Sequence, residues 1–230
     1  MQVFELLLQI CFSRPQHYER VSEQIGRFLD AALGRTERYR RFHVSHDFKS
    51  YTFDLPYPLE SEHIYRQEKI YAIRIRTIQE PLAAYFVKVL PTHEAVGIQG
   101  LSGELRILPR CSLGRVYTLT PVVMKTRQGY WRGNLRPAEY EARLRDNLIR
   151  KYNFFHHTEL PGDLSLYQKM EFRNRKPVKI PCKNVVLLGD KISMTASGSA
   201  MAQEVLYMAL GTGVGENNAR GCGFLHYRIG

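Results

Sequence analysis

The amino-acid sequence predicts an α+β protein built from two tandem ferredoxin-like domains, each with the element order β-α-β-β-α-β. Two observations support this prediction. Segments that alternate polar and apolar residues, as half-buried strands do, are interleaved with segments whose apolar residues recur every three or four positions, as in helices. The order of these segments in the first half of the chain recurs in the second half. We therefore assign residues 1–112 to the first domain and residues 113–230 to the second.

The first half supplies one complete set of six elements. Its first helix has an apolar stripe that includes Val21 and Phe28, and Gly34 follows as a residue suited to a helix end. Arg74 and Arg76 alternate with isoleucines, as expected of a half-buried strand. The expected strand, helix, two strands, helix and final strand or hairpin cover residues 2–12, 15–33, 50–57, 70–78, 81–91 and about 96–108.

The second half repeats this order, although the two halves share no evident sequence identity. A helix begins at Pro137, and its apolar residues lie three or four apart from Tyr140 to Phe155. Gly189 and Asp190 lie between two apolar runs and predict a hairpin turn. The expected strands cover residues 115–126, 164–173, 185–196 and 222–229, and a further helix covers residues 199–210.

The charge balance indicates a protein that binds an anionic partner. The 230 residues include 33 Lys and Arg against 22 Asp and Glu, which gives a formal net charge of +11. The sequence pI is about 9.6. Such an excess of basic residues is typical of proteins that bind nucleic acid, and a basic protein that is merely soluble is the alternative.

The cysteines and the hydropathy pattern exclude several other classes of protein. The four cysteines lie far apart and form no Cys-x-x-Cys pair, so we expect neither a metal site nor a disulfide framework. We expect no membrane partner, because no apolar run is long enough to span a bilayer and the N-terminus lacks the features of a signal peptide. Four reduced thiols indicate a cytoplasmic protein.

The most distinctive motif is a glycine-rich run near the C-terminus, with the pattern G-x-G-x5-G-x-G. Its glycines are Gly213, Gly215, Gly221 and Gly223. Glycine permits positive φ angles and a close approach to a ligand, so such a loop can direct N–H groups at phosphate. Within it, the side chains of Asn217, Asn218 and Arg220 can donate to phosphates or base edges. The run lacks the ending of a P-loop and follows a helix, which excludes a Rossmann fingerprint; a glycine-rich turn without a ligand is the alternative.

A second cluster lies between residues 39 and 49 and contains Tyr39, His43, His46 and Lys49. Histidine can exchange protons near neutral pH, and lysine can stabilise the negative charge that develops on phosphorus. These groups suffice to cleave RNA without a metal, by attack of a 2′-OH on the adjacent phosphate. The alternative is a surface loop whose histidines only form hydrogen bonds. No His-x3-His or His-Glu-x-x-His spacing occurs, so a metal site is not expected.

The densest basic run, RNRKPVK, contains Arg173, Arg175 and Lys176. Basic side chains in such a run can hold an RNA stem by its phosphates, with an affinity that falls as salt rises. A solvated hairpin tip is the alternative.

GVGENNARGCGF, from Gly213 to Phe224, and KSYTF, from Lys49 to Phe53, resemble two segments of one known family. This is the CRISPR-associated (Cas) protein six family, the repeat-RNA-processing endoribonucleases of the RAMP superfamily. The family pairs a histidine after the first helix with a lysine before the second strand, and His43 and Lys49 match that pair. His46 is a rival, because His46-Asp47 is similar to the family's His-Asp or His-Asn pair.

The resemblance leaves the tyrosine of the family without an exact match. That tyrosine lies near the end of the first helix, where this chain has Phe28, so Tyr39 is taken as the substitute. The resemblance implies an endoribonuclease that needs no metal or other cofactor and cleaves CRISPR repeat RNA to mature guide RNAs. The products would carry a 2′,3′-cyclic phosphate and a 5′-OH.

Two other functions remain alternatives. A non-catalytic RAMP subunit that binds guide RNA in a CRISPR effector complex would share the fold, the charge and the glycine run, but it would not need His43, His46 and Lys49. A general RNA-binding module with RRM-like halves is less well supported, because the first half lacks the aromatic strand motif of such modules. Association with an effector complex and formation of a homodimer are left open.

Overall fold

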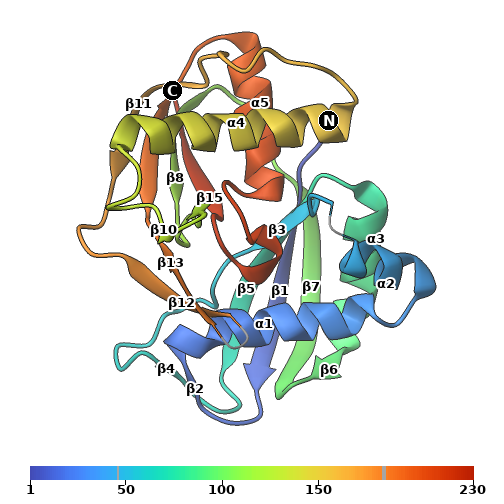
Figure 1. Cartoon of the computed structure of the whole chain (residues 1–230). Coiled ribbons are helices and arrows are strands. Elements are labelled where there is room, and N and C mark those ends of the chain that lie inside the picture. The colour runs from blue at the N-terminus through green and yellow to red at the C-terminus, as the bar shows by residue number, and fades with distance from the viewer. Residues whose placement is uncertain (46, 183–184) are drawn as a thin grey trace.

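The computed structural model describes residues 1–45, 47–182 and 185–230 and confirms an α+β fold with two ferredoxin-like halves. The two halves lie one above the other (Figure 1). The strands and helices of the first half are β1 Phe4–Phe12, α1 Tyr18–Leu33, β3 Tyr51–Phe53, β5 Ile70–Thr77, α3 Glu80–Val89 and β7 Ile98–Ile107. Those of the second half are β8 Leu113–Thr118, α4 Pro137–His156, β11 Tyr167–Phe172, β14 Ile192–Ala196, α5 Ala200–Thr212 and β15 Leu225–Ile229.

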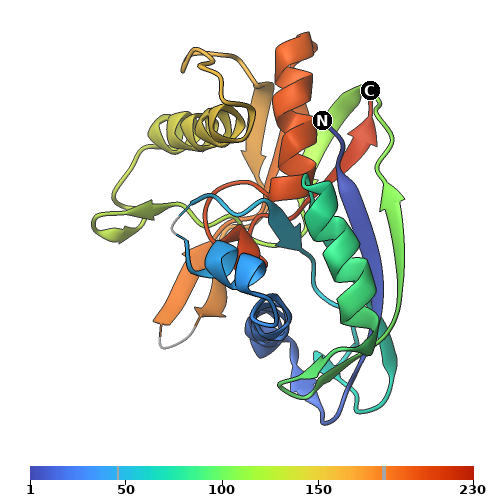
Figure 2. The same ribbon diagram turned by 90° about the vertical axis from the view of Figure 1, so that its right-hand side faces the viewer.

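The sheet topology shows that the repeat of element order is also a repeat of architecture. The first sheet has the order β3-β5-β1-β7, with the short strand β6 (Glu94–Ala95) at its edge, and the second has the order β11-β14-β8-β15. In both sheets the second, third, first and fourth strands of the half therefore lie side by side, and all pairs are antiparallel. The helices of both halves lie on the same side of the two sheets (Figure 2). The predicted domain boundary falls between β7 and β8 and stays a prediction.

A short helix, α2 (Glu37–Val44), follows α1 and was not expected from the sequence. Its residues are mostly charged, so they leave no apolar stripe for the sequence pattern to reveal. Local bonds define it instead: the Thr36 side chain caps its first turn by accepting from the N–H of Tyr39 (3.4 Å), and Glu37 pairs with Arg41 (2.8 Å). This helix carries His43 in its last turn.

The strand expected over residues 185–196 is two strands in different sheets. β13 (Val185–Gly189) pairs with β12 (Val178–Cys182) in a separate hairpin, whereas β14 joins the main sheet. The hairpin turn predicted at Gly189 and Asp190 is therefore wrong. Asp190 is instead fully buried between the two strands, where its carboxylate accepts from the Tyr130 hydroxyl and the Trp131 indole, both at 2.6 Å.

A buried arginine of the first sheet contacts both halves. The guanidinium of Arg76 on β5 pairs with Glu5 on β1 (2.6 Å), and it also donates to the Leu225 carbonyl at the start of β15 (2.6 Å). It lies 4.4 Å from the centre of the Phe224 ring. Burial favours the neutral form of Glu5, yet the contacts with Arg76 and Arg106 together outweigh it and keep the pKa of Glu5 below its ordinary value. The first sheet thus holds the C-terminal strand through one charged side chain.

We predict that Arg76→Leu lowers the free energy of unfolding by about 3–5 kcal/mol, because it leaves the Glu5 carboxylate buried without its main partner. Arg106→Leu is the matched control: Arg106 pairs with the other oxygen of Glu5 (2.5 Å), but its side chain is 59% exposed against 2% for Arg76. This control should cost less than about 1 kcal/mol. Equal losses for the two variants in urea denaturation would contradict the account.

Candidate active site

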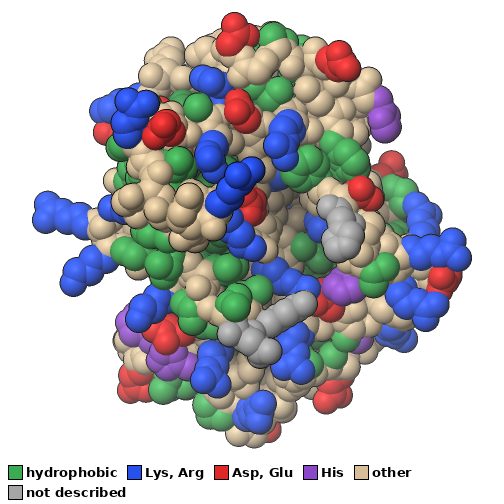
Figure 3. Space-filling view, in the orientation of Figure 1, with side chains coloured by type: hydrophobic (Ala, Val, Ile, Leu, Met, Phe, Trp, Pro, Cys, Tyr) green, Lys and Arg blue, Asp and Glu red, His purple; other side chains and the backbone are tan. Residues whose placement is uncertain are grey.

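A pocket of about 440 Å³ lies between the two halves and receives side chains from both. The first half contributes His43, Lys49 and Tyr51, together with Asp30 of α1. The second half contributes two residues of α4 and the glycine-rich loop; these are Asn147, Lys151 and residues 215–220. Lys and Arg side chains gather on this face of the molecule, around the boundary between the halves (Figure 3). Two of the four predicted catalytic residues therefore meet the glycine-rich run in one place.

His43 is held at the pocket by an acidic side chain. The Nδ1 atom of His43 lies 3.2 Å from the Oδ1 atom of Asp30, and the two side chains are 29% and 20% exposed. The other carboxylate oxygen of Asp30 forms an ion pair with the guanidinium of Arg220. The successive helices α1 and α2 and the distant C-terminal loop thus converge on one carboxylate.

Lys49 closes the end of α2. Its ammonium group donates to the carbonyl oxygens of Phe42 and Ser45, both at 2.6 Å, and to the Ser45 hydroxyl at 3.0 Å. The last carbonyls of a helix have no partner within the helix, so a cation is favoured there. Burial lowers the pKa of Lys49 from its ordinary value, and the nearby carboxylate of Asp47 opposes that shift. Lys49 therefore fixes the turn that carries His43 and brings a positive charge to the pocket.

The structure does not bring Tyr39 to the pocket. Its ring packs on Tyr85, with the centroids 4.3 Å apart, and its hydroxyl donates to the Pro81 carbonyl (2.7 Å). Tyr39 is the buried residue of α2, and the charged residues of this helix are exposed to solvent. The tyrosine that does line the pocket is Tyr51, and burial raises its pKa above the ordinary value. His46 lies outside the described residues.

The glycines of the C-terminal run pack against the protein itself. A Cβ atom at Gly221 would lie 2.6 Å from the Phe53 ring, and one at Gly223 would lie 2.0 Å from the Val214 carbonyl; both residues have positive φ angles. The N–H groups of Gly213, Gly221 and Gly223 donate to backbone carbonyls of the chain. They are therefore not free to cradle phosphate, contrary to the expectation from the sequence.

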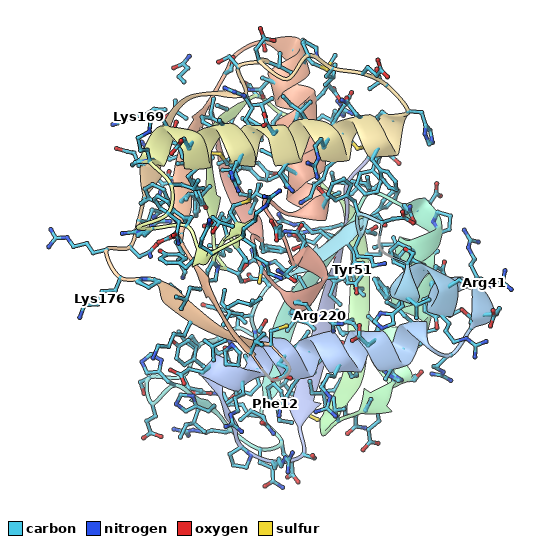
Figure 4. All side chains as sticks on the ribbon, viewed as in Figure 1. Phe12, Arg41, Tyr51, Lys169, Lys176 and Arg220 are labelled. Carbon is cyan, nitrogen blue, oxygen red and sulfur yellow. The ribbon has the colours of Figure 1, made fainter. Side chains whose placement is uncertain are left out.

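The pocket-facing part of the loop runs from Gly215 to Arg220 and includes the predicted RNA-binding residues Asn217 and Asn218. Of these two, Asn218 stabilises the loop itself, because its amide donates to the carbonyls of Val214 and Cys222, both at 2.9 Å. Arg220 lies between the halves, near Tyr51 (Figure 4). RNA contact through Gly215, Asn217 and Arg220 stays a prediction.

A buried lysine of the second half holds the glycine-rich loop through hydrogen bonds. Lys151 of α4 donates to the carbonyls of Gly213 (3.0 Å) and Gly215 (2.8 Å) and to the side-chain oxygen of Asn218 (2.6 Å). Burial lowers its pKa to about 7. The sequence carries a signal for this role, because Lys151 lies beside Leu148 and Tyr152 of the apolar stripe. No comparable signal marks Asp30, whose role depends on contacts with distant segments.

The remaining predicted RNA-binding residues lie elsewhere. Arg173 lies over the Tyr117 ring (5.3 Å) in a second hollow of about 370 Å³, on the face of the second sheet that the helices leave open. Arg115 and Arg228 line the same hollow. Arg175 and Lys176 are exposed in the turn between β11 and β12, and Lys176 points away from the body of the protein (Figure 4).

The described part of the chain contains neither a candidate metal site nor a helix that could span a membrane. No group of three or more His, Cys, Asp or Glu side chains there is arranged so that it could hold a metal ion. Within residues 1–45, 47–182 and 185–230, no helix combines the length and the apolar character that crossing a membrane requires.

Comparison with known proteins identifies the family. The family model described as "CRISPR associated protein Cas6, C-terminal" matches residues 111–227, about half of the chain. The chain belongs to the Cas6 family. Its match covers the second half, including the glycine-rich loop that lines the pocket. A search of the curated proteins found no match.

Solved Cas6 structures share the whole fold at low sequence identity. A CRISPR-associated protein Cas6 is 18% identical, with a TM-score of 0.73 over 98% of this chain and 99% of that one. A RAMP protein described as binding different RNA substrates is 17% identical, with a TM-score of 0.72 over 99% and 100% of the two chains. The Cas6 of Thermus thermophilus, solved as a product complex, is 19% identical, with a TM-score of 0.61 over 99% of each chain.

We predict that Lys151→Met destabilises the protein by roughly 2 kcal/mol or more at about pH 9, because it leaves buried carbonyls unpaired. The loss should grow as pH rises from about 7. The unfolded chain binds a proton at Lys151 up to its ordinary pKa of 10.5, whereas the folded chain releases it near pH 7. The wild type therefore gains stability over the variant in that window, by at most about 1.4 kcal/mol per pH unit.

Arg150→Met is the control, since it removes a cation from an exposed position of the same helix. It should change the free energy of unfolding by no more than about 0.5 kcal/mol at either pH. A loss for Lys151→Met that shrinks as pH rises would contradict the assignment.

Proposed function

We propose that this Cas6 protein is a metal-independent endoribonuclease that cleaves CRISPR repeat RNA to mature guide RNAs. The observation that carries the proposal is the pocket between the halves, where His43, Lys49 and Arg220 converge beside the loop that the family model matches. Structural neighbours solved as product and substrate-mimic complexes support a role in processing repeat RNA. A scaffold subunit would have no need for an imidazole at this position.

The proposed chemistry uses the ribose next to the scissile phosphate as the nucleophile. His43 accepts the proton of the 2′-OH, and the 2′ oxygen attacks phosphorus as the bond to the 5′ oxygen breaks. The departing 5′ oxygen takes a proton from the imidazolium formed at His43 or from water. The products are a 2′,3′-cyclic phosphate and a 5′-OH, so atoms and charge balance without an added reactant.

The cations of the pocket stabilise the phosphorane by their charge. The donors of Lys49 are already directed at the end of α2, and Arg220 is paired with Asp30. Both therefore act mainly through the local potential, which is stronger in a partly buried site than in water. Tyr51 is a poor general base, because burial raises its pKa and keeps the phenol protonated. His46 stays the alternative proton acceptor.

RNA outside the cleavage site has two basic surfaces to follow. One is the turn that carries Arg175 and Lys176, and the other is the open sheet face with Arg115, Arg173 and Arg228. Tyr117 and His226 stack on this face, with their centroids 5.4 Å apart, and offer an aromatic platform for a base. We place the protein in the cytoplasm; membership of an effector complex and a homodimer stay predictions.

We predict that His43→Ala slows cleavage of a CRISPR repeat RNA from the source genome by about 100-fold or more in EDTA, since it removes a proton-transfer group. Affinity for the same RNA with a 2′-deoxy substitution at the cut site should change little. His157→Asn is the control: His157 is exposed at the end of α4 with φ 52°, a conformation that asparagine tolerates. Labelled RNA on denaturing gels measures the rate, and mass spectrometry identifies the cyclic phosphate.

Cleavage by His43→Ala at the wild-type rate would show that the assigned site is wrong. If the wild type binds the RNA but cuts none of it, with or without EDTA, the non-catalytic RAMP subunit is the better description.

A further inference from the structure

The carboxylate of Asp30 lies between the imidazole of His43 and the guanidinium of Arg220, at the wall of the pocket. We propose that Asp30 is the positioning residue of the cleavage site: it fixes the ring of His43 and selects the tautomer that leaves Nε2 free to exchange a proton with RNA. This inference rests on the proposed function and adds a residue that neither the sequence motif nor the family match assigns.

One carboxylate oxygen of Asp30 is isolated. The Oδ1 atom of Asp30 is buried, and it accepts no hydrogen bond from the described residues. The Nδ1 atom of His43 lies 3.2 Å from this oxygen. A buried acceptor without a partner is costly, so the arrangement favours a proton on Nδ1. In neutral histidine the proton on one nitrogen leaves a lone pair on the other, which here is Nε2.

Two other charged groups of the pocket are engaged elsewhere. The ammonium of Lys49 is bound to Phe42 and Ser45. Glu216 accepts from the backbone N–H of Lys125 (3.4 Å) and lies on the loop of the second half. Among the residues that the structure describes, Asp30 is the one carboxylate within ion-pair distance of His43.

Asp30 is itself held firmly by its neighbours. Its Oδ2 atom pairs with Arg220, and the backbone carbonyl of Arg220 accepts from the Ser22 hydroxyl of α1 (2.7 Å). Arg220 is therefore anchored through both its side chain and its backbone. Positioning residues work best when their own orientation is fixed by neighbours, as this one is. The second half thereby sets the orientation of a histidine that belongs to the first half.

Two substitutions separate the parts of this role. Asp30→Asn keeps an acceptor oxygen for Nδ1 but removes the charge, and Asp30→Leu removes both. We expect cleavage at saturating protein to slow about tenfold for Asp30→Asn and about 100-fold for Asp30→Leu. Affinity for the 2′-deoxy repeat RNA should stay within about threefold, since the change acts on the rate rather than on uniform binding.

The matched control is Glu19→Gln, which makes the same change of charge on α1, the helix of Asp30, at an exposed position outside the pocket. Its cleavage rate should equal that of the wild type. A spectroscopic readout adds a test that a merely structural role would not meet. In nitrogen-15 spectra of labelled histidine, neutral His43 should carry its proton on Nδ1 in the wild type and in Asp30→Asn, and shift toward Nε2 in Asp30→Leu.

The outcomes are distinguishable from a failure of the proposed function. If His43→Ala loses cleavage while Asp30→Asn and Asp30→Leu both cut at the wild-type rate, the positioning role is wrong and the cleavage site stands. If His43→Ala also cuts normally, the site itself is wrong. Should Asp30→Leu fail to fold, Asp30→Asn decides alone: a rate within about twofold of the wild type overturns the inference.

Discussion

The close approach of the C-terminal glycine-rich loop to the first half of the chain is the constraint on which the rest of the structure depends. At Gly221 the loop touches the ring of Phe53 and the hydroxyl of Ser22, where any side chain would collide. The next strand is then held by the guanidinium of Arg76. Because the loop lies this close, Arg220 reaches Asp30, and through Asp30 the loop reaches His43. The glycines thus permit the close contact between the halves at the candidate site.

The positive side chains of the pocket are each paired with an acceptor of negative or partial negative charge. Under the proposed function the pocket must attract a phosphate, yet the cations Lys49 and Arg220 would repel each other if they had no partners. The structure places Asp30 between His43 and Arg220 and satisfies Lys49 with the carbonyls at the end of α2. The excess of positive charge therefore remains beside the pocket while each cation has a local partner. An RNA backbone entering the pocket would meet a positive potential that is already organised.

Much of the fold could be predicted from the sequence, because the spacing of apolar residues follows the buried face of each helix or strand. The two β-α-β-β-α-β sets follow from alternation in strands such as β5 and from apolar stripes in helices such as α1. Helix α2 was missed because its stability comes from the Thr36 cap and charged pairs rather than from an apolar face. The β12–β13 hairpin was missed because the buried carboxylate of Asp190, which interrupts the apolar run, gives no sign of burial in the sequence.

Site residues could be predicted from the sequence only where the side chain itself indicates a catalytic role. His43 and Lys49 were found because imidazole and ammonium groups six positions apart suggest proton transfer and charge stabilisation. Tyr39 was assigned to the site because its orientation on α2 could not be known; the structure turns it toward Pro81. Asp30 lies near the end of α1, where the resemblance leaves a tyrosine unmatched, but its importance depends on Arg220, 190 positions away. Contacts between such distant segments are set by the docking of the halves.

A structure of the protein bound to a repeat RNA with a 2′-deoxy substitution at the cut site tests the central claim most directly. The account predicts that the scissile phosphate lies in the pocket between α2 and the glycine-rich loop, within hydrogen-bonding reach of Nε2 of His43. A scissile phosphate on the open face of the second sheet, beside Arg115 and Arg173 and remote from that imidazole, would contradict it.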